Sequence, residues 1–389
     1  MVVVVGAALT PFNRRKDRSG VRDWAREAFD AALAMSEIAR EDIDALIVAS
    51  ESDFFTLQLN PASVLAQDLG LCGAATLRVE GGGATGQLAV HAGVERILSG
   101  RARHVAVVGV DPSASALSGD SIRELYGYSF DFWTDGLSGV TATALYALAW
   151  QAFAASHGAT GQDLDAVTTK NRGNAMSNPN AHLPRRHVPE DFSASPIIAA
   201  PFCRLHCSPL SDGAAALILS ATEAAPWARR KAAPQITGIG AASDLPGLGH
   251  RRDPGRFTAK SLAAKRALKM AGVDASQIAV AEVYDAYAGA EIQAVTALGL
   301  APDPVRAFRE GVFDAGGQLP VNLSGGLMGQ GAPVGATGVG QTATCAMLLE
   351  GRYHAGLQPG RPPGHAMADT HGGVGTTSAV TVLKAADAG

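Results

Sequence analysis

Four cysteines in this sequence could act as nucleophiles, bind zinc or form disulfides: Cys72, Cys203, Cys207 and Cys345. Only Cys203 and Cys207 lie close together, and no second pair at a matching spacing completes a zinc site. Four cysteines in 389 residues do not make a disulfide framework either. We therefore expect free thiols, a reducing cytoplasmic location and no bound metal.

The composition indicates a large folded chain. Hydrophobic residues make up 47% and charged residues 17%, which excludes a disordered chain. Lys and Arg (32) nearly balance Asp and Glu (36), so we expect no attraction to nucleic acid or to an anionic membrane. The first residues, Met1–Gly6, predict a strand rather than a signal peptide. The uncharged run 137–157 contains enough polar residues to predict a buried helix rather than a membrane span.

An internal repeat relates the two parts of the chain. Segments 31–48 and 266–283 both have the pattern of an amphipathic helix, a short loop and a β-branched strand, and Ile43 and Ile278 are 235 residues apart. The motif Gly-Ala-Thr-Gly opens a predicted helix at Gly83 and again at Gly335.

This repeat, with its alternating strands and helices, predicts two pseudo-symmetric α/β halves. We place the N-terminal half at 1–230 and the C-terminal half at 231–389. Residues from about 112 to 205 depart from the repeat and are rich in Pro, His, Asn and Arg towards their end. This stretch is predicted to be a loop domain inserted into the first half.

Three motifs carry a resemblance to a known family. The stretch Asn322–Gly338, the stretch Cys207–Ala216 (Cys-Ser-Pro-Leu-Ser-Asp-Gly-Ala-Ala-Ala) and Glu282-Val-Tyr-Asp285 resemble signatures of the thiolase superfamily, most closely those of the sterol-carrier-protein type. The resemblance covers the whole chain. It implies the α/β thiolase fold, in which two pseudo-symmetric halves form a five-layer αβαβα arrangement.

The resemblance also shows where this sequence departs from the family pattern. The family's nucleophilic cysteine, in a Cys-Ala-Ser-Gly type motif, falls on Gly83, and the histidine of its Gly-His-Pro motif falls on Ala332. The histidine of the His-Asn-Glu-Ala-Phe type motif falls on Tyr284, whereas His371 matches a histidine of sterol-carrier-type members. Glycine cannot attack a thioester, so acyl transfer through a covalent intermediate is not expected.

Some members that lack the cysteine resemble this chain closely, namely the thiolase-like aldolases of bacterial steroid side-chain degradation. The resemblance implies retro-aldol cleavage of a β-hydroxyacyl-CoA, such as a steroid side-chain ester, to a ketone and a shorter acyl-CoA. It implies no cofactor beyond the coenzyme A of the substrate. It also implies a homodimer and a small OB-fold, zinc-ribbon partner subunit, which would together give a heterotetramer.

Retro-aldol chemistry needs a base for the hydroxyl, a site for the enolate and an acid for the departing carbon. Tyr284 is our candidate base because it follows a predicted strand of an α/β sheet, although a phenol pKa of about 10 must then be lowered. Tyr287 is the competing candidate or a wall residue. His371 could be the acid, a hydrogen-bond donor or a structural group, and Asp285 could orient Tyr284 or His371, or cap the turn after the strand.

The remaining candidates concern binding. The backbone N–H groups of Gly83 and Gly373 are expected to form the enolate hole, and Ala332, Asn322 and Gly325 are expected to bind substrate. Two alternatives stay open: a noncatalytic subunit that binds acyl-CoA or lipid, and a degenerate acyltransferase that uses one of the remaining cysteines.

Overall fold

The structure is a computed structural model that describes residues 1–14, 17–225, 227 and 233–386. In this part of the chain, nine strands form one mixed sheet in the order β3-β2-β4-β7-β1-β8-β11-β10-β9. The strands are β1 Val2–Leu9, β2 Ala45–Ala49, β3 Ala75–Val79, β4 His104–Pro112, β7 Asp212–Ala221, β8 Gln235–Ser243, β9 Val280–Glu282, β10 His365–Gly372 and β11 Thr377–Lys384. A separate hairpin joins β5 Ile197–Ala199 to β6 Phe202–Cys203.

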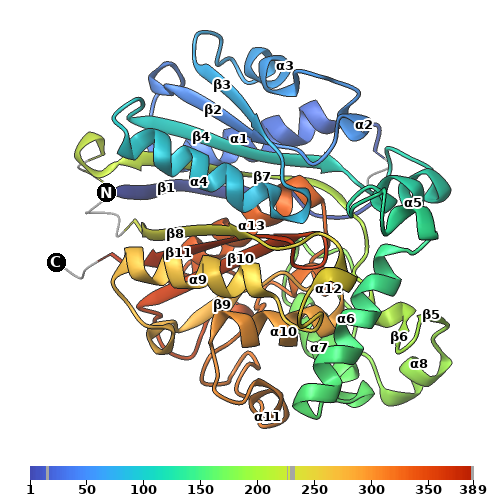
Figure 1. Cartoon of the computed structure of the whole chain (residues 1–389). Coiled ribbons are helices and arrows are strands. Elements are labelled where there is room, and N and C mark those ends of the chain that lie inside the picture. The colour runs from blue at the N-terminus through green and yellow to red at the C-terminus, as the bar shows by residue number, and fades with distance from the viewer. Residues whose placement is uncertain (15–16, 226, 228–232, 387–389) are drawn as a thin grey trace.

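The helices cover both faces of this sheet (Figure 1). They are α1 Val21–Ser36, α2 Asp53–Thr56, α3 Pro61–Asp68, α4 Thr85–Leu98, α5 Gly119–Gly127, α6 Ala142–His157, α7 Gly161–Ala175, α8 Pro189–Ala194, α9 Thr258–Ala271, α10 Ala288–Leu298, α11 Pro304–Arg309, α12 Gly326–Gly329 and α13 Val334–Leu349.

The five layers expected from the sequence are confirmed. Helices α4 and α13 lie side by side between the two halves of the sheet, and each contacts strands of both halves (Figure 1). Helices α1 and α3 pack on the outer side of the first half, and α9 and α10 on the outer side of the second. The two half-sheets join where β1 pairs antiparallel with β8 through Val2 and Ile236.

The internal repeat corresponds to equivalent elements in the two halves. The segment 31–48 runs from α1 into β2, and the segment 266–283 runs from α9 into β9. The two Gly-Ala-Thr-Gly motifs lie at the starts of α4 and α13, where an added Cβ on Gly86 would come within 2.6 Å of Gly338 N. The glycines therefore allow the two central helices to approach backbone to backbone.

Between β4 and β7 the chain leaves the sheet and forms α5 to α8 with the β5–β6 hairpin. This segment covers the stretch that we predicted to be an inserted loop domain, and we refer to it as the inserted region. The boundary that we placed at 230/231 lies outside the described residues. The helix expected over 137–157 begins only at Ala142, because Thr141 caps it by accepting a hydrogen bond from Ala144 N at 3.2 Å.

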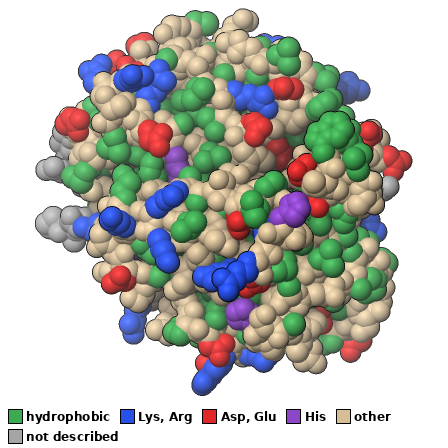
Figure 2. All heavy atoms as spheres, in the orientation of Figure 1, with side chains coloured by type: hydrophobic (Ala, Val, Ile, Leu, Met, Phe, Trp, Pro, Cys, Tyr) green, Lys and Arg blue, Asp and Glu red, His purple; other side chains and the backbone are tan. Residues whose placement is uncertain are grey.

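The described helices are all too short or too polar to cross a bilayer. On the face that Figure 2 shows, basic and acidic side chains are interspersed, in keeping with the nearly balanced charge of the chain.

Candidate active site

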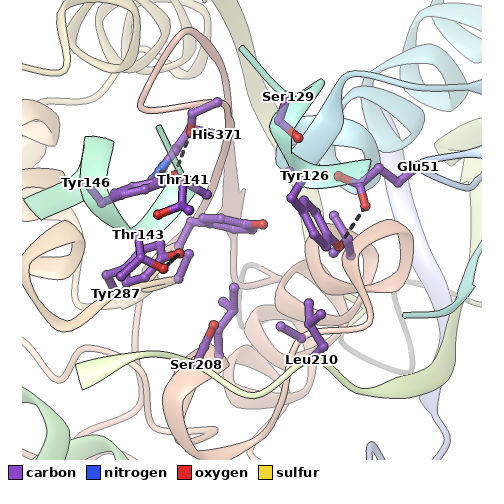
Figure 3. A pocket seen from close by; sticks show the side chains of 18 of the residues that line it. Glu51, Tyr126, Ser129, Thr141, Thr143, Tyr146, Ser208, Leu210, Tyr287 and His371 are labelled. Atoms are coloured by element: carbon purple, nitrogen blue, oxygen red, sulfur yellow. Dashed lines mark hydrogen bonds between the residues drawn. The ribbon is translucent and has the colours of Figure 1, made fainter. Parts of the chain in front are cut away.

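One cavity of about 240 Å³ lies where the residues that open α4 meet the carboxyl ends of β9 and β10 (Figure 3). The structure brings together at its wall several residues expected from the sequence: Gly83, Tyr284, Tyr287, Ala332, His371 and Gly373. The rest of the wall is mainly apolar, aromatic or hydroxyl-bearing: Glu51, Tyr126, Ser129, Phe130, Thr141, Ala142, Thr143, Tyr146, Ser208, Leu210, Ala286, Leu327 and Val334.

The Tyr284 hydroxyl occupies the space beside Gly83. A Cβ added to Gly83 would lie 2.5 Å from the Tyr284 hydroxyl oxygen and 2.2 Å from the His371 carbonyl oxygen. Tyr284 is held from behind, since its backbone N–H donates to Asp369 Oδ2 at 3.2 Å and Asp369 forms a buried ion pair with Lys260. A side chain at position 83 and a phenol at position 284 therefore compete for one volume.

The surroundings of Tyr284 keep its phenol protonated. Burial raises the pKa of Tyr284 well above its ordinary value, and the charges of Glu51 and Asp285 raise it further. A base would need the opposite shift. The environment thus suits Tyr284 as a proton or hydrogen-bond donor rather than as the base that we expected.

His371, on β10, is a neutral hydrogen-bond donor to Tyr146. Tyr146 OH lies 2.6 Å from the Gly373 carbonyl oxygen, to which it donates its one proton, and 2.8 Å from His371 Nε2. His371 must then carry its hydrogen on Nε2, which leaves Nδ1 as an acceptor; Nδ1 is buried and has no protein partner among the described residues. Burial lowers the pKa of His371 well below its ordinary value, as do the charges of Lys260 and Arg251.

Tyr287 is part of an aromatic wall. Its ring stacks on Phe202 at 5.6 Å between centroids and lies 4.5 Å from the ring of Tyr146. Its hydroxyl is 3.0 Å from Thr143 Oγ1, and burial raises its pKa. Ring packing and a partnered hydroxyl favour the wall role over that of a base.

Asp285 lies behind the cavity wall and caps α12. Its carboxylate accepts hydrogen bonds from Leu327 N at 2.6 Å, Met328 N at 3.2 Å and Asn171 Nδ2 at 2.7 Å. Burial raises the pKa of Asp285 to about 8. Asp285 thus caps the short helix α12, and not the turn after its own strand as the sequence suggested.

Asn322 and Gly325 also lie behind the wall rather than in it. Asn322 Oδ1 accepts from Val283 N at 2.8 Å, and its Nδ2 donates to Glu291 at 2.7 Å, so its side chain ties β9 to α10. Gly325 has a φ of 102°, and an added Cβ would meet Ala175 of α7 at 2.8 Å. Both positions shape the loop that carries the wall, whereas Ala332 reaches the cavity itself.

The cysteines lie outside the cavity wall in the described structure. Cys203 and Cys345 are buried, and Cys72 is exposed. Burial raises the pKa of Cys207 to about 12 and that of Cys345 well above its ordinary value. Neither thiol is therefore activated as a thiolate near neutral pH.

Glu51, Tyr126 and Tyr146 all line the cavity, but the sequence alone did not predict them as site residues. Tyr126 and Tyr146 lie in the inserted region, which has no repeat partner to compare. Glu51 had a usable signal: it follows β2 as the Tyr284–Tyr287 segment follows the equivalent strand β9. In a duplicated protein, the segments that follow equivalent strands of the two packed halves are candidates for one shared site.

These observations define a duplicated α/β protein in which one site forms between the start of a first-half helix and the strand ends of the second half. Two family models match the chain: "Thiolase, N-terminal domain" over residues 2–193 and "Thiolase C-terminal domain-like" over residues 240–385. The chain belongs to the thiolase superfamily and is a thiolase-like acyl-CoA enzyme of the sterol-carrier-protein type.

Named relatives and solved structures resemble the chain over nearly its whole length. It is 33% identical to an acetyl-CoA acetyltransferase of Methanothermobacter thermautotrophicus, covering 98% of this chain and 99% of the relative. It is 25% identical to the benzoylsuccinyl-CoA thiolase subunit BbsB of Thauera aromatica, over 96% and 94% of the two chains. The structure of an Ltp2-ChsH2(DUF35) aldolase superposes with a TM-score of 0.84 at 24% identity, covering 100% of this chain and 98% of that one.

Proposed function

We propose that this protein is a carbon–carbon lyase that cleaves a β-hydroxyacyl-CoA by a retro-aldol reaction, releasing a ketone and a shorter acyl-CoA. The observation that carries the proposal is the occupation of the space beside Gly83 by the Tyr284 hydroxyl. Claisen chemistry needs a nucleophilic side chain at the start of α4, whereas retro-aldol cleavage needs none. It needs proton transfer and stabilisation of an enolate.

The side chains at the wall can supply these two functions. Tyr284 holds its proton and lies beside the start of α4, so it can protonate the enolate carbon as the bond breaks. The backbone segments of Gly83 and Gly373 both reach the cavity, and their N–H groups would hold the thioester oxygen. His371 fixes Tyr146 and, through it, the carbonyl of Gly373.

The acyltransferase alternative is favoured by the 33% identity to an acetyl-CoA acetyltransferase. It would require one of the remaining thiols to attack an acyl-CoA, and the raised pKa values of Cys207 and Cys345 oppose this. The other alternative, a noncatalytic subunit that binds acyl-CoA or lipid, needs the cavity but no proton transfer.

For the substrate, we propose a β-hydroxyacyl-CoA with a branched and bulky β-carbon, such as a steroid side-chain ester. A cavity of about 240 Å³ is below the size of about 300–1,000 Å³ that drug-sized ligands occupy, so a steroid nucleus would lie beyond it.

For partners, we propose a homodimer with a small second subunit of the DUF35 type, guided by the complex named for the Ltp2-ChsH2(DUF35) aldolase structure. The exposed edge of the first half-sheet is β3, where Leu77 is 42% exposed. An apolar residue on an unpaired edge strand is a suitable contact for a second copy of the chain.

The test is product analysis by mass spectrometry, with and without a candidate DUF35-type partner. The smallest substrate would be β-hydroxy-β-methylbutyryl-CoA, which would give acetone and acetyl-CoA. The largest would be a steroid side-chain acyl-CoA in which the β-carbon is a ring carbon that bears the tertiary hydroxyl. Release of a ketone together with the shortened acyl-CoA is expected. Intact substrate across the panel, with every partner tried, would contradict the lyase; a stable cysteine thioester after incubation with labelled acyl-CoA would favour the acyltransferase.

A further inference from the structure

Glu51 is the one carboxylate among the described residues that line the cavity. It lies two residues after β2, and its backbone N–H donates to Asp111 Oδ2 at 3.0 Å, which fixes the strand end that carries it. Its Oε2 accepts a hydrogen bond at 3.1 Å from the hydroxyl of Tyr126, a residue of α5 (Figure 3). The carboxylate is therefore positioned at the wall by two elements.

Glu51 also lies between the reaction cavity and a second cavity. The second cavity, of about 400 Å³, shares four wall residues with the first: Glu51, Tyr126, Ser129 and Gly373. If the α-carbon of the acyl-CoA lies beside Tyr284 and Gly83 and the β-substituents extend into the second cavity, the β-carbon lies at this shared wall. The hydroxyl of the β-carbon would then come close to Glu51.

We propose that Glu51 is the catalytic base that accepts the proton of the substrate β-hydroxyl, and that Tyr126 is its positioning residue. This inference rests on the proposed lyase function and assigns the one role that Tyr284 and His371 leave open. Tyr284 is held protonated, and His371 is a poor base because burial and the charges of Lys260 and Arg251 lower its pKa well below its ordinary value.

The step balances without any further reactant. The hydroxyl proton passes to the Glu51 carboxylate, the oxygen forms the ketone C=O, and the electron pair of the Cα–Cβ bond moves into the thioester enolate. The enolate carbon then takes the Tyr284 proton, and the resulting phenolate recovers a proton from the carboxylic acid of Glu51. One β-hydroxyacyl-CoA becomes one ketone and one shorter acyl-CoA, with no net gain or loss of protons.

The environment gives Glu51 a proton affinity suited to this exchange. Burial raises the pKa of Glu51 to about 8, the charges of Asp111 and Glu80 raise it too, and the hydrogen bond from Tyr126 lowers it. Tyr284 faces it from the second half, and Arg78 of β3 donates to the neighbouring Ser50 carbonyl at 3.2 Å. General bases are most effective when their pKa lies near the working pH.

The test compares kcat/KM against pH for the wild type, Glu51→Gln, Glu51→Asp and Tyr126→Phe, on a substrate that the wild type cleaves. The wild-type rate should rise with pH through about 8, as Glu51 loses its proton. Glu51→Gln should lose about 10²-fold or more and lose this rise, while Glu51→Asp should keep the rise with a smaller loss. Tyr126→Phe should move the rise to higher pH, because the hydrogen bond that lowers the pKa of Glu51 is gone.

Glu350→Gln is the matched control, because Glu350 is a half-buried glutamate with a raised pKa at the end of α13, away from the cavity wall. It should behave as wild type. Thermal melting and acyl-CoA binding would show whether Glu51→Gln folds; if it does not, the Tyr126→Phe shift decides. If the wild type cleaves the substrate but kcat/KM of Glu51→Gln stays within about threefold of it, the role of Glu51 alone is overturned. The same holds if the pH profile of Tyr126→Phe does not move. A wild type that cleaves nothing overturns the lyase and this role together.

Discussion

The two Gly-Ala-Thr-Gly segments begin equivalent helices but meet different surroundings. At the start of α13, Gly335 N donates to Asp111 Oδ2 at 2.6 Å, and an added Cβ on Gly335 would lie 2.6 Å from the Ala49 carbonyl oxygen. At the start of α4, an added Cβ on Gly83 would meet the His371 carbonyl oxygen and also the Tyr284 hydroxyl. Ala49 and Tyr284 are 235 residues apart, the spacing of the repeat, so the phenol stands where the first half has a methyl group.

Under the proposed function, this difference means that one duplicated feature serves packing in one copy and chemistry in the other. The first turn of a helix has free N–H groups and a partial positive charge. At α13, the Gly335 N–H group donates to the buried Asp111 carboxylate, so an internal acceptor already occupies this helix start. At α4, the same position opens on a cavity, where an oxyanion of the substrate could be held.

The largest effect should come from Tyr284→Phe. If the phenol protonates the enolate carbon, its loss should lower kcat by about 10²-fold or more while acyl-CoA binding is retained. Steady-state kinetics and a binding titration measure the two quantities. The control is Tyr353→Phe, since Tyr353 is buried like Tyr284 and lies outside the walls of both cavities. Unchanged turnover in Tyr284→Phe would show that the phenol does not protonate the enolate carbon.

The next largest effect is on the free energy of unfolding, and it distinguishes Gly83 from Gly335. Gly83→Ala and Gly335→Ala should each lower the free energy of unfolding by about 1–3 kcal/mol, because each Cβ meets a backbone carbonyl. Adding Tyr284→Phe should restore part of the loss for Gly83→Ala, since it removes the oxygen 2.5 Å from the new methyl group, but none of the loss for Gly335→Ala. Urea unfolding of the single and double variants measures this. Strict additivity at position 83 would show that the phenol does not occupy that volume.

The features that the sequence predicted are those that the repeat makes visible. Ile43 and Ile278 mark β2 and β9, and the motifs at Gly83 and Gly335 mark the two central helices. A repeated helix and strand pattern is local, so it can be recognised without knowledge of the packing. The family resemblance then aligned Tyr284 and His371, and the structure brings both to one cavity.

The missed features depend on contacts between distant segments. Tyr146 joins His371 across 225 positions of the sequence, from an insertion that no repeat constrains. Asn322 looked like a ligand-binding residue within a glycine-rich motif, but its φ of 56° and its bond to Val283 N turn its amide inward. The pKa of Tyr284 likewise depends on burial, which a strand-end position alone does not specify.

A smaller effect is expected at the start of α13, where Asp111 should make the free energy of unfolding depend on pH. Burial raises the pKa of Asp111 to about 7, so the folded protein binds this proton more tightly than the unfolded chain does. The contribution of Asp111 to stability therefore falls as pH rises from about 4 to about 7. Asp111→Asn removes this pH-dependent contribution. The difference in free energy of unfolding, variant minus wild type, should therefore increase by about 1 kcal/mol or more from pH 5 to pH 8.

Urea unfolding at the two pH values measures this difference, and Asp44→Asn is a control because Asp44 lies at the opposite end of β2 and bonds to the N–H groups of Arg103 and His104. Equal pH dependence in Asp111→Asn and wild type would mean that the carboxylate at α13 carries a charge in the folded protein at every pH tested.

The smallest effect is expected from the thiols. If the start of α4 carries the chemistry, Cys207→Ala should leave kcat within about twofold of wild type, because the thiol of Cys207 bonds to the Cys203 carbonyl at 3.6 Å and burial raises its pKa to about 12. The same result is expected for Cys345→Ala, whose thiol is buried against the Met367 carbonyl, although the cavity that this leaves should lower stability. Steady-state rates on the substrate cleaved by the wild type measure both variants. A loss of about 10²-fold in kcat in either folded variant would place the nucleophile outside the α4 site and favour the acyltransferase alternative.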